Sequence, residues 1–345
     1  MNEFKIGHRK IAPENPPFII AEVGINHDGS LDKAIQCVDS AVNAGADCVK
    51  FQCHITEAEM IPNKIVPENA KEPLWDIIKR CELTDEEERR VKSYCEEKNI
   101  IYLCTPFSRE AADRLQTMDV LAFKIGSGEC NNIPLLEHIS KFGKPIILST
   151  GMNDLGSIKQ SVEAIQKNSC SLMLMHCTSM YPTPYDKVRL GAIPELIQEF
   201  GLPVGLSDHS IGIYTCLGAV ALGACALEKH FTQSHHWPGP DIPISIDPDE
   251  LEELAKGSKA VYSALNGHKT VLPEEQPVKE FAFASVVSIK DIRKGDVLSV
   301  DNIWVKRPGT GKIGVQEFYS ILGKTAKEDI DKDLQLSRDL INGSD

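Results

Sequence analysis

Charged and hydroxyl side chains stand at the ends of short hydrophobic runs in this sequence, where they could bind an anion. Lys50 and Lys124 lie in the otherwise apolar runs "DCVKFQC" and "VLAFKIGSGE". A buried ammonium is costly unless it is paired or holds an anion. A single such lysine is typical of a structural ion pair, but two lysines with several hydroxyls favour a ligand that carries a phosphate and a carboxylate. The polar residues at the ends of the runs are Glu22, Lys50, Gln52, Thr105, Lys124, Ser127, Glu129, Ser149, Ser179, Tyr181, Ser207, His209, Glu228 and His230.

Two histidines could share a divalent metal ion. His209 ends "LPVGLSDHS" and His230 ends the next run, "CALEKHFT", with the carboxylates of Glu228 and Glu129 available. Mixed imidazole and oxygen ligation favours manganese or iron, whereas an open coordination position would fit catalytic zinc. The residues alone leave the choice of metal open.

Eight hydrophobic runs alternate with amphipathic stretches, and this alternation predicts the fold. The helical stretches carry end signals, such as Ser30 before "LDKAIQCVDSAVNAGA" and the capping box formed by Thr84 and Glu87. Apolar strands alternating with helices indicate a parallel sheet buried on both faces, and eight units predict an α/β fold, a (β/α)₈ TIM barrel with its active site at the carboxyl ends of the strands. The runs cover residues 18–27, 47–53, 100–107, 120–129, 144–151, 171–179, 202–210 and 225–232.

The pattern changes near the carboxyl end. Residues 271–281, "VLPEEQPVKEF", read as a linker, so we expect a barrel domain over residues 1–270 and a second domain over residues 282–345. The second part contains a weak internal echo, "DIRKGDVLSVDNI" against "DIDKDLQLSRDLI". Two short hairpin-like modules would explain this echo, and they predict a small β-rich domain.

Composition restricts the location and the partners. The formal net charge of −13 disfavours nucleic acid and anionic membranes as partners, and no apolar run is long enough to span a membrane. The amino terminus lacks a signal-peptide core, and the 11 cysteines are scattered through apolar runs without a CxxC pair, as reduced thiols would be. We therefore expect a cytoplasmic protein.

Read in order, the ends of the runs resemble the sialic acid synthase family. The motifs are "AEVGINHDG", "VKFQ", "TPF", "KIGSGE", "LSTGM", "HCTSMYPTP", "LSDHSIGI", "EKHF", "GPD" and "WVKRPGTG". The resemblance implies a barrel followed by a β-rich antifreeze-like (SAF, β-clip) domain, in a homodimer whose small domains are swapped over the partner's active site. It also implies a metal-dependent condensation of phosphoenolpyruvate with an open-chain, N-acylated mannosamine-type sugar, which releases phosphate and forms a nine-carbon acid.

The resemblance also implies residue roles. His209 and His230 would bind the metal, with manganese expected and magnesium or cobalt as substitutes, and Glu22 and Glu129 would join them at the reacting centre. Arg307 would reach the sugar from the partner subunit, beside the other sugar contacts, Glu22, Phe107, Tyr181 and Asp241. The phosphoenolpyruvate contacts would be Lys50, Gln52, Thr105, Lys124, Ser127, Ser149, Ser179 and Ser207.

The chain departs from common family patterns in places that bear on the sugar. Ser179 stands where many members have Asn, and Ile242 follows Asp241 where many have His. An apolar Ile242 beside the sugar could accommodate a 2,4-diacetamido-2,4,6-trideoxy sugar, which then competes with N-acetylmannosamine as substrate. The alternative functions are a related condensation on a sugar phosphate and, in another class, a non-catalytic carbohydrate-binding protein.

Overall fold

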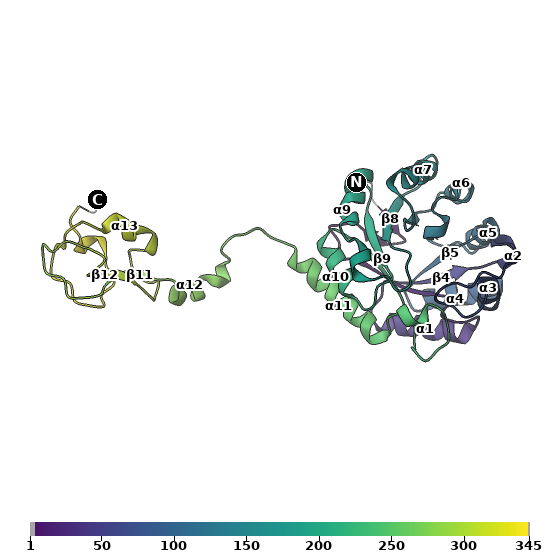
Figure 1. Ribbon diagram of the computed structural model, residues 1–345, viewed down its shortest axis with the longest axis horizontal. Helices are drawn as coiled ribbons and strands as arrows, with labels where there is room; N and C mark the ends of the chain where they lie inside the picture. Colours follow the sequence, from purple (N-terminus) through teal and green to yellow (C-terminus); the bar gives the residue numbers. More distant parts are fainter. Residues whose placement is uncertain (1–3, 344–345) are drawn as a thin grey trace. The chain divides into compact units, whose positions relative to one another are not determined.

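The computed structural model describes residues 4–343, which form two compact units over residues 4–266 and 267–343 (Figure 1). The first unit holds eight parallel strands, each covered by helices. The hydrogen-bonded order is β5, β4, β3, β10, β9, β8, β7, β6, and β5 lies against β6 at the seam without a ladder between them. The predicted (β/α)₈ architecture is therefore confirmed. The strands are β3 Phe18–Gly24, β4 Cys48–Cys53, β5 Ile101–Pro106, β6 Phe123–Ile125, β7 Ile146–Ser149, β8 Leu172–Cys177, β9 Val204–Asp208 and β10 Ala226–His230.

The helices of the first unit lie around the strands (Figure 1). Two of them begin as their sequences predict: the Ser30 side chain accepts from the Lys33 N–H at the start of α1, and Thr84 and Glu87 form a capping box at the start of α4. The helices are α1 Leu31–Asn43, α2 Thr56–Glu59, α3 Leu74–Cys81, α4 Asp85–Glu97, α5 Arg109–Thr117, α6 Ile133–Ser140, α7 Leu155–Gln166, α8 Tyr185–Val188, α9 Ala192–Phe200, α10 Tyr214–Ala221 and α11 Pro248–Ala264.

The sheet is buried on both faces, as a parallel sheet must be. One large apolar cluster joins the outer face of the strands to the helices, and a second fills the interior of the barrel. The second cluster includes an amino-terminal hairpin of β1 (Phe4–Ile6) and β2 (Arg9–Ile11), whose Phe4, Ile6 and Ile11 side chains pack against Phe18 and Ile20. The hairpin closes the end of the barrel at which the strands begin. All 11 cysteines are buried and unpaired.

The second unit is small and has its own core. It begins with 3-10 helix η3 (Pro273–Glu275) and helix α12 (Gln276–Ala282), and it pairs strand β11 (Ser285–Ser288) with β12 (Ile303–Lys306) in antiparallel fashion. The remaining helices are η4 (Val315–Glu317), α13 (Phe318–Ile321) and η5 (Arg338–Leu340).

The two copies of the internal echo face each other in this unit. Ile292 and Ile330 form an antiparallel bridge. The Lys294 N–H donates to the carboxylate of Asp329 at 2.7 Å, and the Lys332 N–H donates to Asp291 at 2.8 Å. The two copies of the repeated Asp-Ile sequence thus make reciprocal contacts.

Over residues 4–343, every helix is too short or too polar to cross a lipid bilayer.

Candidate active site

Strand register brings opposite charges together at the carboxyl end of the barrel. Glu22 on β3 lies opposite Lys50 on β4 and also opposite His230 on β10, while Glu228 lies opposite Ser207 on β9. Residues opposite each other on neighbouring parallel strands are close in space, so four adjacent strands supply one cluster. These residues meet because each lies near the end of its apolar run, at the carboxyl end of a strand.

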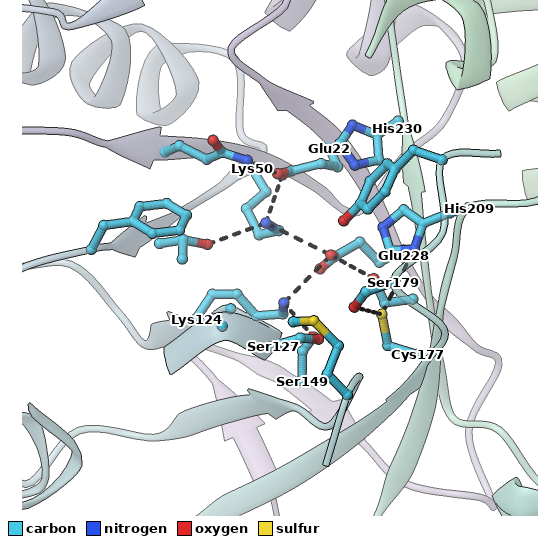
Figure 2. A pocket seen from close by; sticks show the side chains of 18 residues that line it. Glu22, Lys50, Lys124, Ser127, Ser149, Cys177, Ser179, His209, Glu228 and His230 are labelled. Carbon is cyan, nitrogen blue, oxygen red and sulfur yellow. Dashed lines mark hydrogen bonds and ion pairs between the residues drawn. The ribbon is translucent and has the colours of Figure 1, made fainter. Parts of the chain in front are cut away.

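Two lysines and two glutamates form a buried network (Figure 2). The Lys50 ammonium lies 2.7 Å from Glu22 Oε2 and 3.7 Å from Glu228 Oε1. The Lys124 ammonium donates to Ser149 Oγ at 2.7 Å and lies 3.4 Å from the same Glu228 oxygen. The other oxygen of Glu228, Oε2, is buried without a hydrogen-bond partner. This oxygen can still accept a hydrogen bond from a ligand or a water.

Burial is the largest influence on the pKa of each group in this network, and the neighbouring charges decide whether that pKa is raised or lowered. Burial opposes the charge of Lys50, but Glu22 and Glu228 outweigh it and raise the lysine pKa. Lys124 has one near carboxylate, so burial prevails and its pKa is lowered. Burial raises the pKa of Glu22, whereas Lys124 and Lys50 outweigh burial at Glu228 and hold its pKa below the usual range. Lys50 and Glu228 are therefore the firmly charged members.

All eight residues predicted to contact phosphoenolpyruvate line one cavity of about 300 Å³. Gly151 contributes to its shape: its N–H donates to Ser127 Oγ at 3.0 Å, and a Cβ at this position would collide with the hydroxyls of Ser127 and Ser179. The predicted residues on its wall are Lys50, Gln52, Thr105, Lys124, Ser127, Ser149, Ser179 and Ser207, with Glu22, Phe107, Tyr181, His209, Glu228 and His230 beside them.

The two histidines of the predicted metal site are neighbours. Their ring centroids lie 5.3 Å apart, and the Tyr181 ring lies 4.3 Å from His209. His209 Nδ1 contacts the Thr178 carbonyl at 3.1 Å, an arrangement that leaves Nε2 for a ligand. His230 Nδ1 is buried without a hydrogen-bond partner and lies 3.9 Å from an Asp241 oxygen. Burial and the neighbouring His209 hold the pKa of His230 well below its usual range, so its imidazole is in the neutral form that binds metals.

These residues fit a divalent ion with open coordination positions. Among residues 4–343, the one group of three potential ligands whose atoms all lie within 4.8 Å is His235, Asp247 and Glu250, so no third protein ligand meets His209 and His230 at that spacing. Two imidazoles would hold the ion, and water or substrate oxygens would complete its shell. Asp247 and Glu250 form the capping box of α11, which accounts for the grouping around His235.

A second cavity, of about 400 Å³, adjoins the first and shares Gln52, Phe107, Tyr181 and His230 with it. Asp241 lies on its wall, and burial raises the pKa of this carboxyl to about 6. Among the described residues, its lining contains neither lysine nor arginine. The apolar part of the wall consists of Ile25, Met60, Pro67, Leu74, Ile77, Ile78 and Pro240.

Two expectations about this region do not match the placement of the side chains. Glu129 closes 3-10 helix η1 (Ser127–Glu129), accepts a hydrogen bond from Asn132 at 2.6 Å, and lines a different surface pocket. Ile242 begins 3-10 helix η2 (Ile242–Ile244), which turns its side chain into the protein, where it is buried, so it lines neither cavity. Each misplacement arises in a short turn that the alternation of strands and helices does not describe.

Arg307 lies just after β12 in the second unit and is exposed there. Sequence reasoning missed Cys177 and His54, which line the first and second cavity, respectively. A signal was available for Cys177, the last residue of β8, because residues two apart on a strand share a face. His54 lies just after β4 ends, where this period no longer fixes the direction of the side chain.

Comparisons with known proteins agree with this architecture. Residues 37–270 match the NeuB family, and residues 283–341 match the SAF domain. An uncharacterised protein of Methanocaldococcus jannaschii is 42% identical over 96% of this chain and 97% of its own. The N,N'-diacetyllegionaminic acid synthase of Campylobacter jejuni is 38% identical over 91% of this chain and 97% of its own. The crystal structure of the N-acetylneuraminic acid synthetase of Leptospira borgpetersenii superposes with a TM-score of 0.74 at 34% identity, covering 80% of this chain and 95% of that one.

Proposed function

Since this chain belongs to the NeuB family, we propose that it condenses phosphoenolpyruvate with an open-chain, N-acylated mannosamine-type sugar. The reaction releases phosphate and forms a nine-carbon sialic or sialic-like acid. The observation that carries this proposal is the pair of buried ammonium groups, Lys50 and Lys124, facing one cavity at the carboxyl ends of the strands. A buried cation with incomplete compensation, as at Lys124, beside a second buried cation is suited to a small, multiply charged anion.

Phosphoenolpyruvate occupies the first cavity in this proposal. Lys124 shares its one nearby carboxylate, Glu228, with Lys50, so its positive charge is only partly compensated. The phosphate and carboxylate of phosphoenolpyruvate supply the missing negative charge. The hydroxyls on the wall donate to the ligand oxygens, and Ser149 already contacts Lys124. When the phosphate leaves, the same ammonium groups stabilise the departing anion.

The sugar occupies the second cavity, with its aldehyde toward the shared residues Tyr181 and His230. The absence of lysine and arginine from the described lining favours an unphosphorylated sugar over a sugar phosphate. The apolar wall suits the methyl group of an N-acetyl substituent, as in N-acetylmannosamine. The diacetamido trideoxy sugar would place more apolar groups there, because it carries a second acetyl group and a methyl group at C6. The carboxylate of Asp241 accepts hydrogen bonds from the sugar hydroxyls.

His209 and His230 hold the divalent ion in this proposal, with Mn²⁺ as the expected species. Bound there, the ion supplies Lewis acidity toward the sugar aldehyde. The side chains around it position the reactants: C3 of phosphoenolpyruvate attacks the aldehyde carbon, the aldehyde oxygen takes up a proton to become a hydroxyl, and a water adds to the cationic C2. Glu22 accepts the proton that this water loses, which balances the proton taken up by the aldehyde oxygen. The C2 hydroxyl of the tetrahedral intermediate then loses its proton to the departing phosphate, and the 2-keto acid remains. Glu22 suits this role because burial raises its pKa and it lines the cavity.

We further propose a homodimer in which Arg307 of one chain reaches the sugar in the partner's site. The exposed position of Arg307 after β12 leaves its guanidinium available for such a contact. A guanidinium can bind the acyl oxygen with two parallel donors.

Phosphate release tests the proposed reaction. The full-length protein with Mn²⁺, phosphoenolpyruvate and N-acetylmannosamine or the diacetamido sugar should release phosphate only when both substrates are present. Removal of the metal with a chelator should reduce the rate at least a hundredfold, and added Mn²⁺ should restore it. Absence of phosphate release with every N-acylated hexosamine would refute the proposal.

A further inference from the structure

His54 lies outside the first cavity but is linked to it through Gln52. It follows β4 directly and is only 3% exposed. Its Nδ1 lies 2.8 Å from Glu59 Oε2, and its Nε2 lies 3.0 Å from Gln52 Oε1. Its ring stacks on Phe107 with a centroid separation of 4.6 Å and an interplanar angle of 15°. Both ring nitrogens and the ring face therefore have fixed partners.

The amide of Gln52 can satisfy its neighbours in one orientation while Glu22 is ionised. Its Nε2 donates to Glu22 Oε1 at 3.1 Å, and Lys50 binds the other oxygen of the same carboxylate. If the amide were reversed, its oxygen would face the carboxylate oxygen. The Gln52 oxygen consequently points at His54 and needs a donor there.

The contact between His54 and Gln52 requires a proton on Nε2. The carbonyl oxygen of Gln52 can only accept, so Nε2 must donate to it, while Nδ1 shares a hydrogen bond with the Glu59 carboxyl group. We infer that His54 carries a proton on Nε2 and that it acts as a positioning residue. It fixes the Gln52 amide so that its NH₂ group faces Glu22.

Short elements hold this arrangement together. Glu59 is the last residue of α2, which begins three residues after β4 ends. The Glu59 side chain is 5% exposed, so its contact with His54 is sheltered from water. The chain from Glu59 through His54 and Gln52 to Glu22 joins this helix to the reacting centre. The assignment rests on the proposed function, because it assumes that Gln52 and Glu22 act on the substrates.

Steady-state kinetics test the positioning role. His54→Ala should lower kcat/KM by roughly tenfold to a hundredfold, as loss of a supporting hydrogen bond does at other sites. His54→Gln places an amide donor near the position of Nε2 and should recover most of the loss. The double variant His54→Ala/Gln52→Ala should be no worse than Gln52→Ala alone, because His54 acts through Gln52. His176→Gln is the matched control: this buried histidine contacts the Val188 carbonyl at 2.7 Å and lines neither cavity.

Full activity of His54→Ala, or losses that multiply in the double variant, would overturn the inference. Neutron diffraction on the wild-type protein gives a test that needs no variant to fold. Deuterium on Nε2 of His54, with the Gln52 ND₂ group toward Glu22, is the expected result. An Nε2 without deuterium, with a reversed Gln52 amide, would contradict it. If the wild-type protein released no phosphate, the proposed function would be refuted. The neutron map would still decide separately whether Nε2 of His54 carries a proton.

Discussion

The cost of burying charge decides which side chains of the site are free to bind substrate. Glu22 and Glu228 both approach Lys50, whereas Lys124 has one carboxylate at 3.4 Å and the Ser149 hydroxyl. Removing one member of a buried charged network leaves the others unpaired. Lys124 is the member with the least compensation, so an incoming anion gains most there.

Replacing Lys124 tests this reasoning at the residue scale. Lys124→Met keeps the unbranched side chain as far as Cε but removes the charged ammonium, and a charge-assisted hydrogen bond contributes about 1.5–3 kcal/mol. The Michaelis constant for phosphoenolpyruvate should therefore rise at least tenfold, while that for the sugar changes little. Lys167→Met, at an exposed residue paired with Glu137, serves as the control. An unchanged constant for phosphoenolpyruvate would show that Lys124 has no part in binding it.

The sequence predicted the site residues that lie within strands better than those in turns. Lys50, Lys124 and His230 could be predicted because a polar residue near the end of an apolar strand points in a known direction. Glu129 and Ile242 lie in 3-10 turns, where no such period fixes the direction of the side chain. His54 was missed because its role depends on its hydrogen-bond partners, Glu59 and Gln52, which become known only from the folded structure.

At the element scale, the eight strands were predictable from apolar runs, and α1 and α4 from their capping residues. The hairpin of β1 and β2 was not, because strands of three residues are too short to show alternation. It matters nonetheless, since Phe4 and Ile6 fill the end of the barrel opposite the site. Secondary-structure periodicity thus predicts the barrel wall, but not the segment that closes it.

The packing of α4 on β4 and β5 contains a buried carboxyl whose titration should affect stability. Burial raises the pKa of Glu88 to about 7, above its ordinary value of 4.5, despite contacts with Cys53 and Arg114. The folded protein therefore holds this proton more tightly than the unfolded chain. The stabilisation is complete below about pH 4.5 and is lost as the pH rises through 7.

Glu88→Gln should remove this dependence. Between pH 5 and pH 8, the free energy of unfolding of the wild type should fall relative to that of the variant by roughly 2 kcal/mol. Urea unfolding at the two pH values measures the difference, with Glu86→Gln, an exposed position on the same helix, as the control. Parallel pH curves for wild type and Glu88→Gln would contradict the assignment.

At the scale of the whole molecule, the proposal requires the second unit to take part in sugar binding. Arg307→Ala should raise the Michaelis constant for the sugar about tenfold or more and leave that for phosphoenolpyruvate nearly unchanged. Arg293→Ala, at another exposed arginine of the same unit, should have no effect. If Arg307→Ala bound the sugar as well as wild type, the contact across the homodimer would be wrong.

The identity of the product is the most direct test of the central claim. The full-length protein should be incubated with Mn²⁺, phosphoenolpyruvate and, separately, N-acetylmannosamine, the diacetamido trideoxy sugar and a phosphorylated sugar, followed by mass spectrometry. The account predicts a new acid whose mass equals that of an unphosphorylated N-acylated sugar plus pyruvic acid, with one phosphate released per product. The account would be contradicted if the phosphorylated sugar were the only sugar condensed with phosphoenolpyruvate, or if no N-acylated sugar gave a condensation product.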